Sequence, residues 1–254
     1  MSLYFASLNS GSNGNCYLIG TIGDYVLIDA GISMRETLKR LSRLSVSIRE
    51  IKAIFISHEH ADHIAGLQRI VSTHNIPVYI SKATYQNSPL QLDQNLVKFI
   101  EQDDNFVIGK LTVKAFSKKH DAADPMSFVV SFNEKCVGIF TDIGNCCENV
   151  KQHFSLCHAV FLETNYDEQL LESGNYPLFL KQRIKSDKGH LSNRQALELF
   201  LQCRNENLSH LFFSHISREN NTQHHISNLF NPHAEKTTFI FAERHRETQL
   251  FSFL

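Results

Sequence analysis

The chain has 254 residues, of which 42% are hydrophobic and 20% are charged, and its formal net charge is −1. This composition is typical of a globular protein and excludes a strongly basic field that would draw the whole domain onto nucleic acid. The start of the chain lacks a secretory signal, and no apolar run reaches bilayer length. We therefore expect a single domain over residues 1–254 in the cytoplasm, with six free cysteine thiols and no membrane partner.

The first part of the chain predicts mainly strands. Apolar residues run or alternate over three segments, namely 3–8, 15–20 and 24–28. A Gly/Asn/Ser-rich turn separates the first two, and a helix over Met34–Leu44 with Ser33 as its N-cap follows the third. The apolar run Ala53–Ile56 then predicts a buried strand, and helical spacing of apolar residues from Asp62 to Val71 predicts a second helix.

In the remainder of the chain, strands alternate with helices. Further strands are predicted at 78–80, 105–108, 111–116, 127–132, 136–140, 159–162, 210–213, 237–241 and 249–253. Further helices are predicted at 166–172, 177–185 and 193–203. This order of elements indicates one continuous domain built from two similar halves.

The stretch Ser57–His63 concentrates three histidines and an aspartate directly after a predicted buried strand. His58 and His60 are two residues apart on an extended chain, so their imidazoles point to the same side. Asp62 and His63 lie where the chain turns into the next helix and point elsewhere. A solvated polar turn is the alternative, but imidazole and carboxylate groups at this density favour metal binding.

Four predicted strands end in a residue that can bind a metal: His58 with His60, then His120, Asp142 and His215. Taken singly, His120 or His215 has even odds of being an ordinary surface histidine. Taken in order, the pattern His-x-His-x-Asp-His, then His, then Asp, then His, resembles the metallo-β-lactamase superfamily.

That resemblance implies an α/β fold, a four-layer αββα sandwich of two mixed β-sheets. It also implies two divalent metal ions (Zn, Mn or Fe) and a metal-bridging hydroxide that acts as the nucleophile. By the superfamily pattern, the ligands of the first ion are His58, His60 and His120, those of the second are Asp62, His63 and His215, and Asp142 bridges the two. Asp29 and Glu163 would support these ligands through hydrogen bonds.

Four further segments resemble the WalJ/YycJ (VicX) family: Ser7–Asn15, Leu162–Tyr166, Gly189–Asn193 and Ser214–Asn221. The resemblance implies a binuclear phosphodiesterase, a 5′-to-3′ exonuclease acting on DNA, and it leaves a homo-oligomer open. The order Glu163, His190, His215 also parallels RNase Z. However, Leu162 replaces the histidine that precedes the glutamate there, which argues against tRNA processing by that route.

Two catalytic and six substrate-binding residues follow from this hypothesis. Asp62 would orient the nucleophile, and His190 would contact the scissile phosphate or protonate the leaving group. Basic residues gather near the metal loops, and a helix start near His190 favours anions. Solvated lysines, a plain N-cap and a simple turn are the alternatives for the substrate-binding set, which comprises Ser12, Asn13, Lys119, His190, Ser192 and Arg218.

Two other functions remain open from the sequence. The same metal site could hydrolyse a small ester, a thioester or a cyclic phosphodiester. The chain could also be a non-catalytic metal-binding regulator, although the complete ligand set speaks against this function. The metal ligands alone do not decide between these functions.

Overall fold

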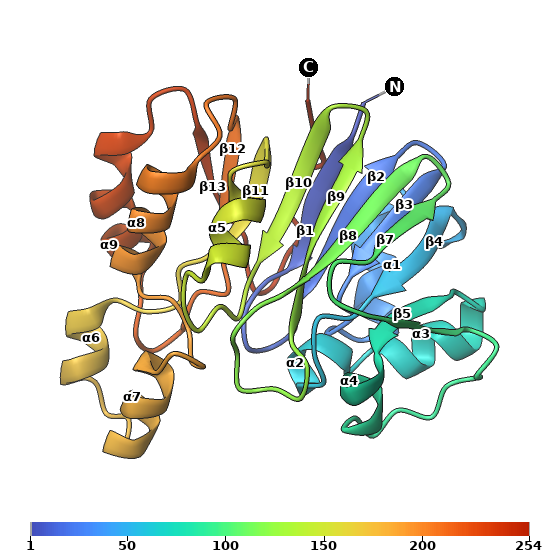
Figure 1. The fold of residues 1–254 in the computed structure, drawn as a ribbon, viewed down its shortest axis with the longest axis horizontal. Helices are drawn as coiled ribbons and strands as arrows, with labels where there is room; N and C mark the ends of the chain where they lie inside the picture. The colour runs from blue at the N-terminus through green and yellow to red at the C-terminus, as the bar shows by residue number, and fades with distance from the viewer. Residues whose placement is uncertain (1, 254) are drawn as a thin grey trace. The chain divides into compact units, whose positions relative to one another are not determined.

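The computed structural model describes residues 2–253, which divide into two compact units. Unit 1 contains residues 2–117, 122–135 and 243–253, and unit 2 contains residues 118–121 and 136–242. The strands form two seven-stranded sheets (Figure 1): the first has the order β14-β1-β2-β3-β4-β5-β6, and the second contains β7 to β13. The single-domain assignment stays a prediction.

Unit 1 contains the whole first sheet and the antiparallel strands β7 to β9. Its strands are β1 (Tyr4–Asn9), β2 (Cys16–Thr21), β3 (Asp24–Ile28), β4 (Ile51–Phe55), β5 (Val78–Ser81), β6 (Val97–Ile100), β7 (Asn105–Ile108), β8 (Leu111–Ser117), β9 (Met126–Phe132) and β14 (Phe251–Ser252). Its helices are α1 (Met34–Arg43), η1 (Ile48–Glu50), α2 (Ala61–Ile64), α3 (Leu67–His74) and α4 (Lys82–Gln86).

The first sheet changes from antiparallel to parallel pairing between β3 and β4. It packs on β7 to β9 through aromatic rings. Phe55 of β4 lies 5.5 Å from Phe128 of β9 and 5.9 Å from Phe106 of β7, centroid to centroid. Rings at these separations form the edge-on and tilted contacts that stabilise a core between two sheets. The strand that leads into the histidine-rich loop is therefore buried between layers.

Unit 2 contains the parallel strands β10 (Lys135–Phe140), β11 (Ala159–Glu163), β12 (His210–Ser214) and β13 (Thr238–Phe241). Its helices are α5 (Glu148–Phe154), α6 (Glu168–Ser173), α7 (Leu178–Lys185), α8 (Asn193–Cys203), α9 (Gln223–Phe230) and η2 (Asn231–His233). Phe213 of β12 contacts Phe230 of α9 with ring centroids 4.7 Å apart, so this helix covers the parallel strands. In Figure 1, α8 and α9 lie beside these strands, and α6 and α7 form a separate pair.

The register of the parallel strands aligns their carboxyl ends. Phe140 pairs with Leu162, and Leu162 pairs with Phe213. Residues that follow β10, β11 and β12 therefore emerge at the same edge of the sheet, which is where parallel α/β sheets bind ligands.

The structure confirms the predicted α/β class, with two mixed sheets flanked by helices. It corrects several predicted elements. The helix predicted over 62–71 is divided into α2 and α3 at Gly66, where a Cβ would lie 1.9 Å from the carbonyl oxygen of Ile32. The helix α9 was missed because only Ile226 and Phe230 in its polar sequence are buried. Within residues 2–253, no helix is long and apolar enough to cross a membrane.

Candidate metal centre

The histidine-rich loop of unit 1 leaves β4 and enters α2. Nε2 of His58 lies 3.1 Å from Nδ1 of His60, and the rings of His58 and His63 are 4.0 Å apart, centroid to centroid. His58 and His63 are buried, whereas His60 and Asp62 are partly exposed. Three imidazole rings are thus gathered on one loop, with a carboxylate 3.5 Å from Nε2 of His63.

Asp29 holds this loop from the end of β3. Its carboxylate is fully buried and accepts hydrogen bonds from Nδ1 of His63 at 2.7 Å, from the backbone N–H of Ser57 at 2.8 Å and from the Ser57 hydroxyl at 2.9 Å. A buried carboxylate is stable only when its oxygens receive such donors. The contact with Asp29 also assigns the proton of His63 to Nδ1, so that the lone pair of the ring is on Nε2.

Two backbone segments fix the position of Asp62 and His63. The backbone N–H of Asn15 donates to the carbonyl of Asp62 at 2.7 Å, and that of Ala30 donates to the carbonyl of His63 at 2.8 Å. Gly31 permits this approach, because a Cβ there would lie only 1.7 Å from the carbonyl oxygen of Asp62. The side-chain amide of Asn15 contacts both Asp62 and His63 at 3.2 Å.

Unit 2 gathers a second cluster at the carboxyl ends of its parallel strands. Asp142 follows β10, Glu163 ends β11 and His215 follows β12, while His190 precedes α8. The ligand atoms of these four residues all lie within 4.8 Å of one another. His120 joins them, because its Nε2 is 3.8 Å from Oδ1 of Asp142. Parallel register therefore brings residues that are far apart in sequence into one cluster.

Glu163 is the central hydrogen-bond acceptor of this cluster. Its Oε1 accepts from Nδ1 of His190 at 2.8 Å and from Nδ1 of His215 at 2.9 Å. Its Oε2 accepts from the backbone N–H of Ile143 at 2.8 Å and from that of Leu191 at 3.1 Å. One fully buried carboxylate therefore ties the Asp142, His190 and His215 loops together.

Two side chains of this cluster have strongly shifted pKa values. Burial favours the neutral form of His120 and lowers its pKa to about 4, although the Asp142 carboxylate opposes this effect. Burial also opposes ionisation of Glu163, but His190 and His215 outweigh it and lower the pKa of that carboxyl to about 2. At neutral pH, Glu163 is an anion and His120 is a neutral imidazole, which is the form that binds metal.

Three residues of the two clusters have left-handed backbone conformations. Asp29, Asp142 and His215 have φ values of 62°, 54° and 50°. Residues other than glycine rarely adopt this region, and such residues concentrate at functional sites. Asp29 and His215 directly follow β3 and β12, and Asp142 lies two residues after the end of β10, so each left-handed residue turns the chain at a strand end and directs its side chain into its cluster.

The tip of the Ser10–Asn15 loop in unit 1 contacts Arg244, and substrate contact by Ser12 and Asn13 stays a prediction. Ser12 and Asn13 are exposed and both contact Arg244: the guanidinium donates to the Ser12 hydroxyl, and the Asn13 amide donates to the Arg244 carbonyl. Asn15, which the sequence did not single out, is the loop residue that reaches the histidine cluster. Its signals in the sequence were its place in a Gly/Asn-rich turn after a strand and in the Ser7–Asn15 segment that resembles the WalJ/YycJ family.

The other predicted substrate-binding residues belong to unit 2 and have unequal surroundings. Lys119 and Arg218 are exposed. Ser192 is fully buried and is the N-cap of α8, because its hydroxyl accepts from the backbone N–H of Gln195 and donates to Glu168. Substrate contact by these three residues stays a prediction, and for Ser192 the hydroxyl already has two partners.

Three buried asparagines that the sequence analysis did not select as site residues connect the loops of the second cluster. The amides of Asn193 and Asn221 bond reciprocally, at 2.9 Å and 2.7 Å. Asn221 also donates to the carbonyl of Thr164 at 2.8 Å, and Asn165 donates to the carbonyl of His215 at 2.8 Å. These bonds fix the loops that carry Glu163, His190 and His215. Only the folded chain reveals such pairs, because their members lie 28 to 57 residues apart.

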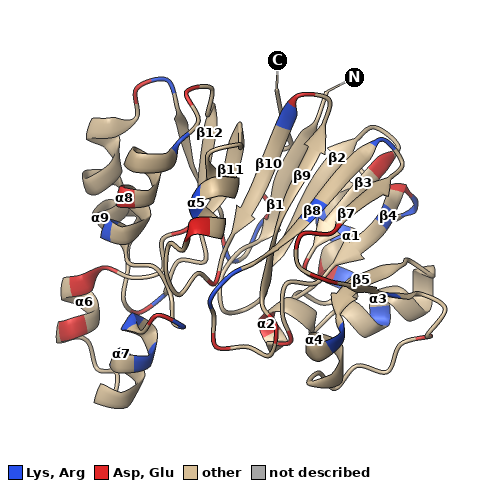
Figure 2. Ribbon diagram, in the orientation of Figure 1, with Lys and Arg blue, Asp and Glu red and all other residues tan. Residues whose placement is uncertain are grey.

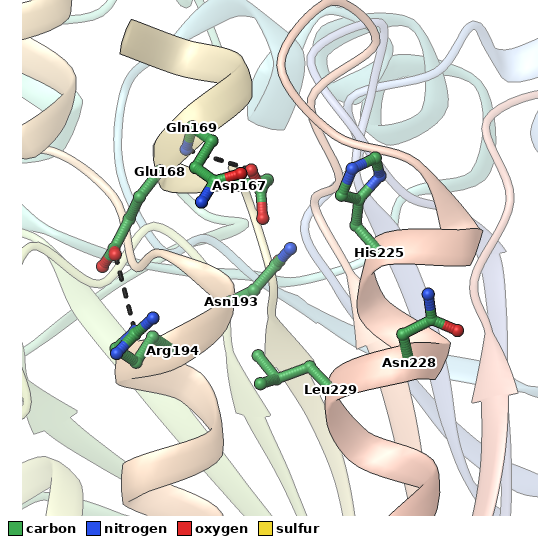
Figure 3. Close-up of a pocket in the computed structure, with 8 residues that line it drawn as sticks. All are labelled: Asp167, Glu168, Gln169, Asn193, Arg194, His225, Asn228 and Leu229. Carbon is green, nitrogen blue, oxygen red and sulfur yellow. Dashed lines mark hydrogen bonds and ion pairs between the residues drawn. The ribbon is translucent and has the colours of Figure 1, made fainter.

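A pocket of about 320 Å³ lies elsewhere in unit 2 (Figure 3). The starts of α6 and α8 and one face of α9 line it, through Asp167, Glu168, Gln169, Asn193, Arg194, His225, Asn228 and Leu229. Arg194 and Glu168 form an ion pair at 3.5 Å on its wall. None of the seven predicted metal ligands is among these lining residues.

The two clusters have the chemistry of a divalent-metal site. Imidazole nitrogens and carboxylate oxygens suit Zn, Mn and Fe. In His63, His120 and His215, a hydrogen bond from Nδ1 to a carboxylate or a carbonyl leaves Nε2 as the ligating atom. Four predicted ligands share one loop of unit 1, namely His58, His60, Asp62 and His63. Three gather in unit 2, namely His120, Asp142 and His215.

Two mixed sheets with imidazoles and carboxylates at their strand ends define the class of the protein. The family described as the beta-lactamase superfamily domain matches residues 24–216. The crystal structure of the metallo-beta-lactamase fold protein YhfI from Bacillus subtilis has the same fold, with a TM-score of 0.72 and 14% sequence identity over 100% of both chains.

Similarity to two relatives identifies the family within this superfamily to which the chain belongs. The chain is 31% identical over 229 residues to exodeoxyribonuclease YycJ of Bacillus anthracis, which covers 87% of this chain and 85% of that protein. It is 29% identical over 222 residues to exodeoxyribonuclease WalJ of Streptococcus pneumoniae, which covers 85% and 82% of the two chains. The chain therefore belongs to the YycJ/WalJ family of the metallo-β-lactamase superfamily, which confirms the resemblance seen in the sequence.

Proposed function

We propose that the protein is a metal-dependent exodeoxyribonuclease that removes nucleotides from the 5′ end of DNA. The observation that carries this proposal is the cluster of Asp142, Glu163, His190 and His215, four ionisable side chains within 4.8 Å at the carboxyl edge of a parallel sheet. Membership of a family whose members YycJ and WalJ are named exodeoxyribonucleases supports DNA as the substrate.

Two divalent ions, Zn, Mn or Fe, would be held by seven residues of the two clusters. His58, His60 and His120 would bind one ion, Asp62, His63 and His215 the other, and Asp142 both. When bound, such ions polarise a phosphodiester and lower the pKa of water toward about 7. The donor types and the Nδ1 hydrogen bonds described above support this assignment.

The remaining roles belong to side chains that position groups or move protons. Nδ1 of His190 is hydrogen-bonded to the Glu163 carboxylate, so His190 can carry a proton on Nε2 and present it to the leaving oxygen. The Glu163 anion stabilises that protonated form. Asp62, whose carboxylate accepts a hydrogen bond from Asn15, would orient the attacking water. Lys119 and Arg218, both exposed, would contact phosphates.

A degradation assay tests this proposal. The full chain with Mn²⁺ or Zn²⁺ is incubated with single-stranded DNA that carries a 5′-phosphate and a 3′-fluorophore. We expect stepwise loss of nucleotides from the 5′ end, which a chelator stops. Asp142→Ala should abolish the reaction, whereas His224→Ala, which removes an exposed histidine of α9, should leave the rate unchanged.

Two parallel substrates make the outcome decisive. Bis-p-nitrophenyl phosphate reports phosphodiesterase activity without DNA, and a thioester reports the alternative hydrolase. Hydrolysis of the thioester with no cleavage of DNA would refute the proposal in favour of a small-molecule hydrolase. DNA cleavage that survives Asp142→Ala would refute the assignment of Asp142 to the metal centre that carries out the reaction.

A further inference from the structure

The helix α7 of unit 2 carries two adjacent exposed apolar side chains at its start. Leu178 is 68% exposed and Phe179 is 71% exposed. Large apolar side chains exposed side by side lose the free energy of burial, so a pair of them commonly marks a contact surface.

The opposite face of α7 packs against the rest of unit 2 and anchors the helix, so Leu178 and Phe179 are not needed for its packing. Ile184 is buried with Tyr166 and Leu171, and Leu180 packs against the same small core. Leu180 and Ile184 are four residues apart and so lie on one helix face. Leu178 and Phe179 therefore point away from the core of unit 2, and the helix is fixed without their help.

The same helix and the turn after it are basic. Residues 175–188 contain four basic side chains and one acidic side chain, and Figure 2 shows α7 marked by Lys and Arg, whereas α6 is acidic. Arg183 is paired with Asp121 at 2.8 Å, with both side chains more than half exposed. Lys185 contacts Glu172 at the surface. Exposed ion pairs contribute little to stability, so a phosphate can replace their acidic partners.

The basic face of α7 is continuous with the second cluster. The carbonyl of Ile184 accepts a hydrogen bond from the backbone N–H of His190 at 2.9 Å. Asp121, the partner of Arg183, is the residue after His120. The turn after α7 also packs on the Asp142 loop, since a Cβ on Gly144 would lie 2.1 Å from the carbonyl oxygen of Asp187.

We propose that the outer face of α7, from Leu178 to Lys188, binds single-stranded DNA next to the bond that is cleaved. This inference rests on the proposed function and adds the surface that receives the rest of the strand. A base stacks on Phe179, and the phosphates on either side meet Arg183, Lys185 and Lys188. Sequence-independent binding of single strands combines an aromatic platform with basic side chains in this way.

The dimensions of the helix fit such a strand. Its eight residues span about 12 Å at 1.5 Å per residue, which is the length of three to four stacked nucleotides. A second copy of this chain is the competing occupant. Charge disfavours it, because a symmetric contact between two α7 faces would bring basic side chains together.

Substrates of two lengths distinguish binding at α7 from cleavage at the metal centre. Cleavage by the full holoenzyme is compared on a 5′-phosphorylated dinucleotide and on a twelve-nucleotide single strand, because only the longer substrate has further nucleotides that can lie along α7. We expect Phe179→Ala to lower the ratio of kcat/KM for the long substrate to that for the short one by roughly 5- to 100-fold. The control Leu201→Ala, which removes an apolar side chain exposed on α8, should leave this ratio unchanged.

The absence of tryptophan from the sequence gives a direct test of stacking. Phe179→Trp introduces a single tryptophan, and stopped-flow mixing with the long strand should quench its fluorescence, whereas the fluorescence of Leu201→Trp should not change. Replacing Arg183 and Lys188 together with glutamine should reduce the slope of log(kcat/KM) against log salt by about 1.4 for the long substrate.

Three results would overturn the inference. In the first, Phe179→Ala lowers the rate on both substrates equally, which would place its effect in the fold or the cleavage site. In the second, fluorescence of Phe179→Trp is unchanged by DNA. In the third, light scattering shows that Phe179→Ala dissociates an oligomer, which would make α7 a contact between copies. If the unmodified protein cleaves neither substrate, the proposed function fails, and the tryptophan signal still decides whether α7 binds DNA.

Discussion

Replacing Glu163 with glutamine changes one atom in the fully buried carboxylate that joins three loops of unit 2. Glutamine has the same shape but only one acceptor oxygen. If that oxygen faces the backbone N–H groups of Ile143 and Leu191, the NH₂ group faces Nδ1 of His190 and His215. Both rings must then accept from this NH₂ group with Nδ1 and carry their proton on Nε2, which removes from His215 the lone pair that a metal requires.

The size of the effect follows from the pKa of Glu163. Its lowering from 4.5 to about 2 corresponds to about 3 kcal/mol of preference for the ionised carboxylate in the folded chain. Because the folded pKa is depressed, this stabilisation is complete above pH 4.5 and is lost as the pH falls toward 2. At pH 7 we therefore expect Glu163→Gln to lower the unfolding free energy by about 3 kcal/mol and Tm by roughly 6–12 °C.

Thermal unfolding by circular dichroism and zinc titration against a competing chelator measure both consequences. Loss of such a supporting hydrogen bond weakens metal affinity by about 10- to 100-fold. The matched control is Glu148→Gln, whose side chain is 90% exposed and whose unfolding free energy should change by no more than about 0.5 kcal/mol. A Glu163→Gln protein that unfolds at the original Tm and binds zinc with the original affinity would refute this reasoning.

Three further predictions concern the same clusters. The unfolding free energy of the metal-free chain should fall by up to about 3 kcal/mol as the pH falls from 6.5 to about 4, because the unfolded chain protonates His120 in this range and the folded chain does not. In His120→Gln, the unfolding free energy measured with urea should lack this contribution to its pH dependence. Gly31→Ala should lower the unfolding free energy by at least about 1–3 kcal/mol and weaken zinc binding, because its methyl group would overlap the carbonyl of Asp62. An unchanged Tm and zinc affinity would contradict this prediction. Asn15→Ala should slow DNA cleavage while far-UV circular dichroism stays unchanged, because the amide that contacts Asp62 and His63 is lost; a full cleavage rate would exclude a role for Asn15.

The parts of the fold that the sequence predicts well are those with strong local signals. The apolar run before His58 and the turn residues that end each strand are recognisable from neighbouring residues alone. A short polar motif follows each of these strands. The boundary of α1 is equally local, since the Ser33 hydroxyl caps the helix by accepting from the backbone N–H of Glu36. In contrast, α9 has a polar sequence in which only Ile226 and Phe230 are buried, so its helical signal is weak.

Supporting residues of the clusters could not be predicted in the same way. The sequence named Asp29 and Glu163 only through family resemblance, and their partners became visible only in the folded chain. Asn15 and Asn165 lie in segments that resemble the family, but the sequence assigned them no contacts, and only the folded chain shows their amides contacting Asp62 and His215. Hydrogen bonds between distant loops depend on strand register, which no local pattern specifies.

Anomalous diffraction from crystals grown with Zn²⁺ or Mn²⁺ tests the central claim most directly. We expect two metal peaks per chain, with Nε2 of His63 and of His215 and the carboxylate of Asp142 among the coordinating atoms. Metal peaks at other residues only, or a chain that cleaves DNA at full rate with no metal at these side chains, would contradict this claim.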